Sequence, residues 1–227
     1  NGTTTANWVV DLSSTLLGLP AQQAITPNII GYAGKSATCP LKINCFGFAQ
    51  GGSMVSNPIG IGHSGGALTL PVTTQVQNYL AQFNGSFNSN QLVTVLAGNN
   101  DIFTALGTVS ATVTQAVTSA LQQNPNLTQA QIAQIQAQAQ QSATTSAVSN
   151  AQNTVATAAD ELAAQIKLIT SKGAKYVMVY TLPDSSQTPF GRGLPYTGLT
   201  PPQTPPAGYV CDNTNTGAPC YLLSNLV

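Results

Sequence analysis

The sequence has almost no charge. Only 5% of its 227 residues are Asp, Glu, Lys or Arg, whereas roughly a quarter of the residues are charged in an average globular domain. Six basic and six acidic residues give a formal net charge of zero. A protein that binds nucleic acid needs clustered Lys and Arg to neutralise phosphates, so this balance argues against nucleic acid and against a polybasic membrane-surface protein.

Long apolar runs and metal-binding motifs are also lacking. No run approaches the roughly 20 apolar residues of a membrane-spanning helix, so no transmembrane segment is predicted. The one histidine, His63, is distant in sequence from every cysteine, and no Cys-x-x-Cys occurs. Neither a metal site nor a cofactor is therefore predicted. Abundant Gln, Asn, Ser and Thr predict a folded, neutral domain with an uncharged polar surface.

The four cysteines form two local pairs. Cys39 lies near Cys45 and Cys211 lies near Cys220, which favours two short-loop disulfides and an oxidising compartment. The chain begins at Asn1, which fits a removed signal peptide. We therefore expect a secreted bacterial protein, extracellular or periplasmic. The alternative is four buried free thiols in a cytosolic protein.

Two apolar runs, Leu92–Ala97 and Lys175–Leu182, predict strands that are buried on both faces of a parallel sheet. Between them, Ala- and Gln-rich stretches at 109–122 and 128–171 predict a long helical hairpin or crossover. Strand, helix, strand in this order predicts an α/β fold, a three-layer α/β/α sandwich around a parallel sheet.

Three local patterns predict helices and their ends. Trp8–Leu17 has apolar residues at a spacing of four, and Pro71 begins a second helix with apolar residues on one face up to Phe83. Thr128 lies three residues before Gln131, as in a capping box, and Gly173 ends the last helix.

The chain after Leu182 differs in kind, because Pro and Gly remove any helical or alternating period. We predict a Pro-rich excursion over 185–227, pinned by a Cys211–Cys220 disulfide, within a single domain that spans 1–227.

The loop after the first apolar strand is the best candidate for chemistry, since ligands bind at the carboxyl ends of parallel strands. An Asn in Gly98–Asp101 can donate a hydrogen bond to an oxyanion, and backbone amides in Gln50–Ser53 can add a second donor. Each segment alone is also ordinary turn chemistry.

Four ordered segments resemble the GDSL, or SGNH, esterase/lipase family. Phe48–Gly52 (Phe-Ala-Gln-Gly-Gly) and Val95–Asp101 (Val-Leu-Ala-Gly-Asn-Asn-Asp) are similar to its second and third blocks. Leu182–Gly191 is similar to a Leu-Pro-Asp…Thr-Pro segment of that family, and Ile61–Val72 to a stretch of its secreted bacterial branch. The resemblance covers the chain from about Trp8 to Gly191.

This resemblance implies a flavodoxin-like α/β/α sandwich and serine-based ester hydrolysis. It assigns the oxyanion hole to the amide of Gly52, with Gly51 as the less favoured choice, and to the side chain of Asn100. Asp101 fixes the loop. The implied substrate is a small-molecule or lipid ester.

Two blocks of the family are missing. Neither Gly-Asp-Ser-Leu, which carries the nucleophile, nor Asp-x-x-His, which carries the general base, occurs in the sequence. The chain therefore supplies neither residue. We expect a truncated, processed or incomplete chain, or a lineage that has lost the triad.

Residues that are present make poor substitutes. Gly62–Gly66 fits Gly-x-Ser-x-Gly, but the required strand before it, the helix after it and a later His are not predicted. Asp160 and Glu161 are adjacent on a predicted helix and do not face one another as an acid/base pair.

Two functions follow from the sequence. The first is secreted ester hydrolysis. The alternative is a non-catalytic, hydrolase-like binding or assembly protein, because a near-zero net charge favours association and the helical hairpin offers a surface for self-association.

Overall fold

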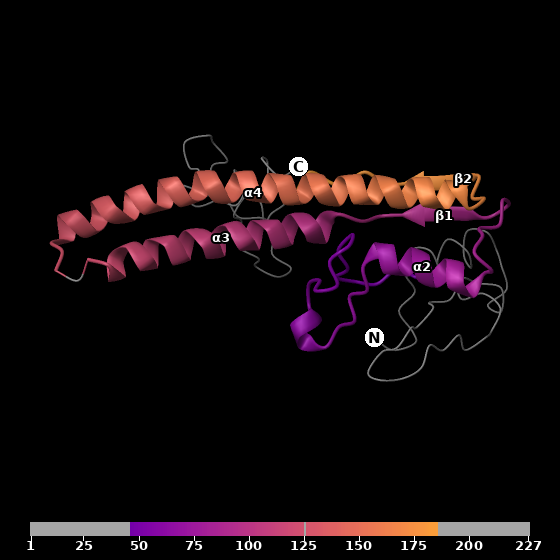
Figure 1. The fold of residues 1–227 in the computed structure, drawn as a ribbon, viewed down its shortest axis with the longest axis horizontal. Coiled ribbons are helices and arrows are strands. Elements are labelled where there is room, and N and C mark those ends of the chain that lie inside the picture. Colours follow the sequence, from indigo (N-terminus) through magenta and orange to yellow (C-terminus); the bar gives the residue numbers. More distant parts are fainter. Residues whose placement is uncertain (1–45, 125, 186–227) are drawn as a thin grey trace, which may run out of the picture. The chain divides into compact units, whose positions relative to one another are not determined.

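The computed structural model describes residues 46–124 and 126–185 of the chain. Helices dominate these residues, and two short strands accompany them. The elements, shown in Figure 1, are the 3₁₀-helix η3 (His63–Gly65), α2 (Val72–Gln82), β1 (Leu92–Val95), α3 (Asn99–Gln122), α4 (Gln129–Ser171) and β2 (Tyr176–Val179).

The described residues divide into two compact units. One contains 46–93 and 164–177, and the other contains 94–124, 126–163 and 178–185. The boundaries between the units fall inside β1, α4 and β2, so each unit contains part of these three elements.

The predicted three-layer sandwich is wrong. Within residues 46–124 and 126–185, the sheet has only two parallel strands, β1 and β2, and most residues are helical. Ala and Gln are strong helix formers, so the chain between the strands forms 24-residue and 43-residue helices instead of further strands. The strands that the sequence predicted are present at both positions, but each is four residues long.

The two strands are also less buried than predicted. Val95 in β1 is 8% exposed, but Tyr176 and Met178 in β2 are 60% and 43% exposed. The expectation that both faces of each strand are covered is therefore wrong for β2 within the described residues. Its pairing with β1 continues past the strand, where the Tyr180 amide donates to the Val95 carbonyl at 2.9 Å.

Helix α2 begins where the sequence predicted. Pro71 precedes its first residue in an extended conformation, and the first-turn amides of Val72 and Thr73 donate to the carbonyls of Met54 and Val55 at 3.1 Å each. These bonds satisfy two of the amides that a helix start leaves without an internal partner. They also attach the segment after Gly52 to the helix.

An aromatic cluster packs along α2 in the first unit. The rings of Tyr79 and Phe87 stack with centroids 4.1 Å apart, and Phe48 meets the edge of Tyr79 at 5.4 Å. The Tyr79 hydroxyl donates to Gln91 at 3.2 Å, and burial raises the pKa of this hydroxyl. The half-buried Phe48 of the Phe48–Gly52 segment thus packs against this cluster.

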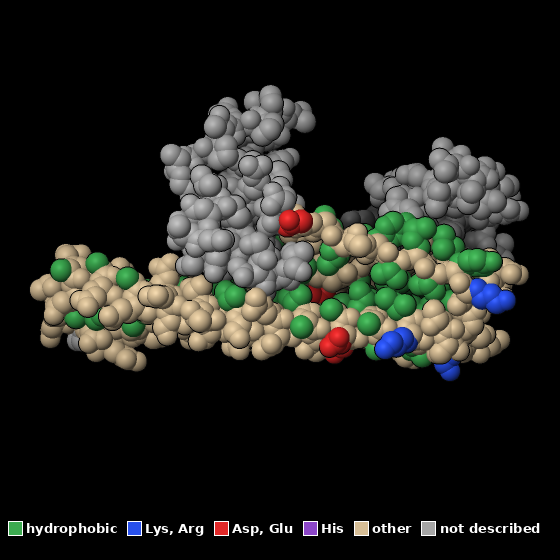
Figure 2. All heavy atoms as spheres, turned by 90° about the horizontal axis from the view of Figure 1, so that it is seen from above, with side chains coloured by type: hydrophobic (Ala, Val, Ile, Leu, Met, Phe, Trp, Pro, Cys, Tyr) green, Lys and Arg blue, Asp and Glu red, His purple; other side chains and the backbone are tan. Residues whose placement is uncertain are grey.

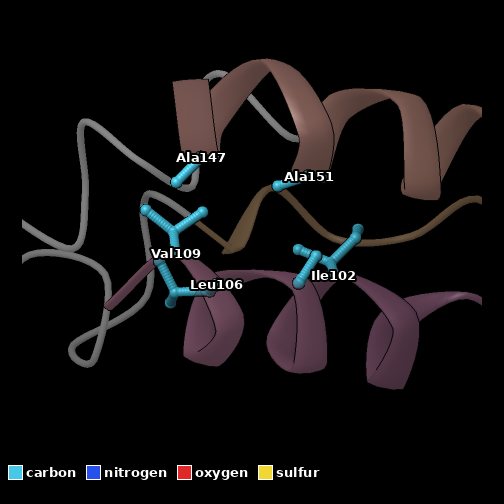
Figure 3. Close-up of a cluster of buried hydrophobic side chains, with 6 residues drawn as sticks. Ile102, Leu106, Val109, Ala147 and Ala151 are labelled. Carbon is cyan, nitrogen blue, oxygen red and sulfur yellow. The ribbon is translucent and has the colours of Figure 1, made fainter. Parts of the chain in front are cut away.

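Helices α3 and α4 form the predicted hairpin and lie side by side (Figure 1). Ile102, Leu106 and Val109 point from α3 towards Ala147 and Ala151 on α4, as Figure 3 shows. The alanines leave room for the branched side chains opposite them. This packing, and not a broad apolar face, holds the second unit together.

The predicted ends of α4 are confirmed. The Gln131 amide donates to the Thr128 hydroxyl at 3.4 Å, and the Thr128 amide donates back to the Gln131 side chain at 2.9 Å. At the other end, Gly173 has a φ of +106°, and a side chain there would press on the Phe87 carbonyl. The capping box and the glycine stop were therefore correct.

Most of the hairpin is uncharged. No Asp, Glu, Lys or Arg occurs from 102 to 159, and the distal part of the hairpin in Figure 2 has neither acidic nor basic side chains on the face shown. Among the described residues, no helix combines the length and hydropathy needed to cross a membrane. The predicted Trp8–Leu17 helix, both cysteine pairs and the 186–227 excursion lie outside the described residues.

We expect Ala151→Leu to lower the free energy of unfolding by about 1–3 kcal/mol, because a larger side chain overpacks a filled contact with α3. Ala151 is 5% exposed. The matched control is Ala133→Leu, an exposed position on the same helix, where a change within about 0.5 kcal/mol is expected. Urea denaturation measures both, and equal stability of the two variants would contradict the packing described here.

Candidate functional site

The segment that resembles the third block begins a helix. The sequence predicted a turn at Gly98–Asp101 and a helix from 109, but α3 starts at Asn99. Gly98 caps it with a φ of +106°, and the Ile102 amide donates to the Gly98 carbonyl at 3.1 Å. Asn100 therefore lies in the first helical turn directly after β1, where its backbone is fixed, instead of in a loose turn.

The chain segment after β2 contacts the start of α3. The Ser185 hydroxyl donates to Oδ1 of Asn99 at 3.2 Å, and Ser185 is only 1% exposed. A Cβ at Gly98 would lie 3.2 Å from Cδ1 of the Leu182 side chain, so Leu182 also packs close to Gly98. Two of the segments that carry the family resemblance, Val95–Asp101 and the start of Leu182–Gly191, are thus brought together in the second unit.

Asp101 is buried in the first turn of α3, with an exposed fraction of 3%. A carboxylate at this position is stabilised by the positive end of the helix dipole. It is also the only charged residue between 43 and 159. Its burial and position fit the structural role that the resemblance implies for it.

Gly52 occupies a crowded backbone crossing in the first unit. Its φ is +79°, and a Cβ at this position would overlap the carbonyl oxygen of Ile61. Gly60 is equally constrained, because a Cβ there would overlap the carbonyl oxygen of Gly52. Only glycine can satisfy both the left-handed conformation and the close approach, so the glycine doublet has a structural requirement at its second residue.

Side chains fix the segment on either side of Gly52. The Gln50 side chain accepts a hydrogen bond from the Leu70 amide at 3.0 Å. Gln75 of α2 donates to the Ser53 hydroxyl at 3.2 Å and to the Leu70 carbonyl at 2.7 Å. The backbone around Gly52 is therefore held in one conformation.

Thr69 organises the neighbouring loop. It is 1% exposed and has a φ of +45°, which is strained for a β-branched residue. Its hydroxyl donates to the Pro58 carbonyl at 3.0 Å and accepts from the Gly60 amide at 3.2 Å. Nδ1 of His63 lies 3.2 Å from the same oxygen.

The proton count at this oxygen fixes the histidine tautomer. A threonine hydroxyl has one proton, and here it points to Pro58. The Thr69 oxygen can therefore only accept from His63, so Nδ1 carries a proton.

The other candidate catalytic residues of the sequence do not form a triad within the described residues. His63 and Ser64 lie in the short helix η3, without the strand and the following α-helix that a nucleophile elbow needs. Asp160 and Glu161 are consecutive residues of α4. No group of His, Cys, Asp and Glu in residues 46–124 and 126–185 could hold a metal ion.

The two proposed oxyanion donors lie in different units, Gly52 in the first and Asn100 in the second. Sequence reasoning did not single out Thr69, Asn99 or Ser185. The contact of Ser185 could have been predicted, because Ser185 follows the second strand and the carboxyl ends of parallel strands share one edge of a sheet. Thr69 had none, since its partners depend on the folded loop.

No protein-family model, no curated protein and no solved structure matches the chain.

We expect Thr69→Val to lower the free energy of unfolding by about 1–3 kcal/mol, because the buried Gly60 amide loses its acceptor. Valine keeps the branched shape, and Thr69→Ser keeps the hydroxyl and serves as the control. Nitrogen-15 NMR of the single histidine reports its tautomer, which should be Nδ1–H in the wild type and mixed in Thr69→Val. A wild-type ring protonated at Nε2 alone would refute the assignment.

Proposed function

We propose that the protein hydrolyses uncharged carboxylic esters by acyl transfer to a serine. The side-chain amide of Asn100 donates a hydrogen bond to the oxyanion of the tetrahedral intermediate, and the main-chain amide of Gly52 is the second candidate donor. Such donors act on charge that develops only as the reaction proceeds, so they lower the barrier more than they strengthen substrate binding.

The observation that carries this proposal is the meeting of two family-like segments at the start of α3. Ser185 holds Asn99 at 3.2 Å, Gly98 caps the helix, and Asn100 follows in its first turn. A preorganised donor needs a fixed backbone, and each of these contacts limits the motion of the residue beside Asn100.

Gly52 gives independent support. An amide donor must be held in place before the substrate arrives, and the backbone on both sides of Gly52 is fixed by Gln50, Gln75 and the crossing with Gly60.

The charge distribution supports an uncharged substrate. Between 43 and 159 the buried Asp101 is the only residue among Asp, Glu, Lys and Arg, so this part of the chain offers no Lys or Arg for a carboxylate or phosphate group. We extend the proposal to a small-molecule or lipid ester without charge near the ester bond, and to a secreted bacterial protein with Cys39–Cys45 and Cys211–Cys220 disulfides.

The chemistry follows the family that the segments resemble. The serine oxygen bonds to the ester carbonyl carbon while its proton passes to a histidine. The tetrahedral intermediate then collapses, and the alcohol leaves with that proton. Water hydrolyses the acyl-serine by the same steps. The serine and the histidine base belong to the two blocks that are missing from this sequence.

A second candidate function is assembly through the α3–α4 hairpin. The 43-residue helix α4 has no charged residue before Asp160, so two copies could pack without like-charge repulsion and without removing charges from water. This function needs neither Gly52 nor Asn100.

We expect Asn100→Ala to lower kcat by about 10²–10³-fold with little change in KM, because a lost oxyanion donor weakens the transition state more than the bound substrate. Steady-state hydrolysis of p-nitrophenyl acetate measures this in the protein that carries this sequence. Asn153→Ala, an exposed position on α4, is the matched control and should leave both constants unchanged.

An unchanged kcat in Asn100→Ala would remove Asn100 from the mechanism. A wild-type protein that hydrolyses no ester would overturn the enzymatic proposal and leave assembly as the function.

A further inference from the structure

Helix α2 ends at a turn that contains an Asn-Gly pair. Asn84 has a φ of +53° and Gly85 one of +73°, so both residues adopt left-handed backbone conformations. The Gly85 amide donates to the Leu80 carbonyl at 2.7 Å. This is the bond of a Schellman cap, with an asparagine in the place that glycine usually takes. Asparagine is one of the few residues with a side chain that visit this conformation. The Gly85 amide therefore helps to close the end of α2.

Asn84 and Gly85 are both exposed to solvent, and an Asn followed by Gly is prone to lose its side-chain amide, because glycine has no Cβ to hinder the approach of its own nitrogen. In this reaction the Gly85 nitrogen bonds to Cγ of Asn84. The Cγ–Nδ2 bond breaks, and Nδ2 leaves as ammonia with the proton of the Gly85 amide. Water then opens the cyclic imide to aspartate or isoaspartate. Asn-Gly occurs at no other position in residues 46–124 and 126–185.

The cap bond opposes this reaction. The Gly85 nitrogen must lose its proton to form the new bond, but the Leu80 carbonyl holds that proton. The same bond fixes the peptide plane that joins Asn84 to Gly85, and ring closure needs this plane to be free to rotate. Both changes require the end of α2 to open, and such local openings cost less free energy than unfolding of the whole domain. The reactive state is thus a locally opened one.

We propose that Asn84 is a site of spontaneous deamidation, and that local opening of the cap bond between Gly85 and Leu80 sets its rate. Deamidation places a carboxylate at the C-terminal end of α2, where the negative end of the helix dipole disfavours it. Isoaspartate also lengthens the backbone by one carbon, so the cap cannot re-form in the same geometry. The aromatic cluster lies next to this end, since the rings of Tyr79 and Phe83 are 4.6 Å apart. Each modified molecule therefore has a less stable first unit.

Peptide mass spectrometry after incubation in mildly alkaline buffer tests the proposal. The peptide with Asn84 should gain the mass of an amide-to-carboxylate conversion. The peptide with Asn153, an exposed helical asparagine followed by threonine, should keep its mass. The Asn84 rate should be at least about tenfold lower in the folded protein than in the urea-unfolded chain, because the open state is a minor one. Urea below the unfolding transition should change this rate little, because a local opening exposes little new surface.

A variant separates the opening of the cap from the chemistry. Ala81→Gly, at an exposed position in the last turn of α2, should raise the Asn84 rate by up to about fivefold, since glycine weakens the helix end. Ala156→Gly, at an exposed position of α4, is the matched control and should leave the rate unchanged. Three results would each overturn the proposal: an Asn84 peptide that keeps its mass, equal rates in the folded and unfolded chain, or equal rates in Ala81→Gly and the wild type.

Discussion

The hydrogen bond from Ser185 to Asn99 connects positions 86 residues apart in sequence, at 3.2 Å. It ties the chain after β2 to the start of α3, and Ser185 is almost completely buried where it makes this contact. Gly98 caps the helix with a φ of +106°, a conformation that residues with a side chain rarely adopt. Asn100 follows Asn99 in the first turn of α3, so these contacts also restrain the backbone of the proposed oxyanion donor.

The sequence was informative wherever a local rule decides the structure. Pro71 marks the start of α2, Thr128 and Gln131 form the capping box of α4, and Gly173 ends it. It was misleading where the outcome depends on what the rest of the chain does. Two apolar runs predicted a covered sheet, but a run shows only that a strand can form, not how many strands join it. The exposed side chains of Tyr176 and Met178 show the difference.

The residues of the candidate site also differ in how far the sequence predicted them. Gly52 and Asn100 could be named from short segments, because the glycine doublet and the Asn-Asn-Asp run follow recognisable patterns. The helix start at Asn99 was missed, since Gly-Asn-Asn-Asp serves equally well as a turn and as a cap. Thr69 could not have been found, because its strained φ and its three partners arise only when Pro58, Gly60 and His63 are folded around it. Likewise, nothing in the local sequence predicts that Ile59 and Ile61 are 64% and 47% exposed.

The central proposal is that the Asn100 side-chain amide donates to the oxyanion of a tetrahedral intermediate. Proton NMR tests it without altering Asn100, when the protein that carries this sequence together with the proposed serine is titrated with an alkyl boronic acid, which forms a tetrahedral adduct with a reactive serine. Our account predicts that an Asn100 Nδ2 proton moves downfield as the adduct forms. An Asn100 Nδ2 proton that does not move would contradict the proposal.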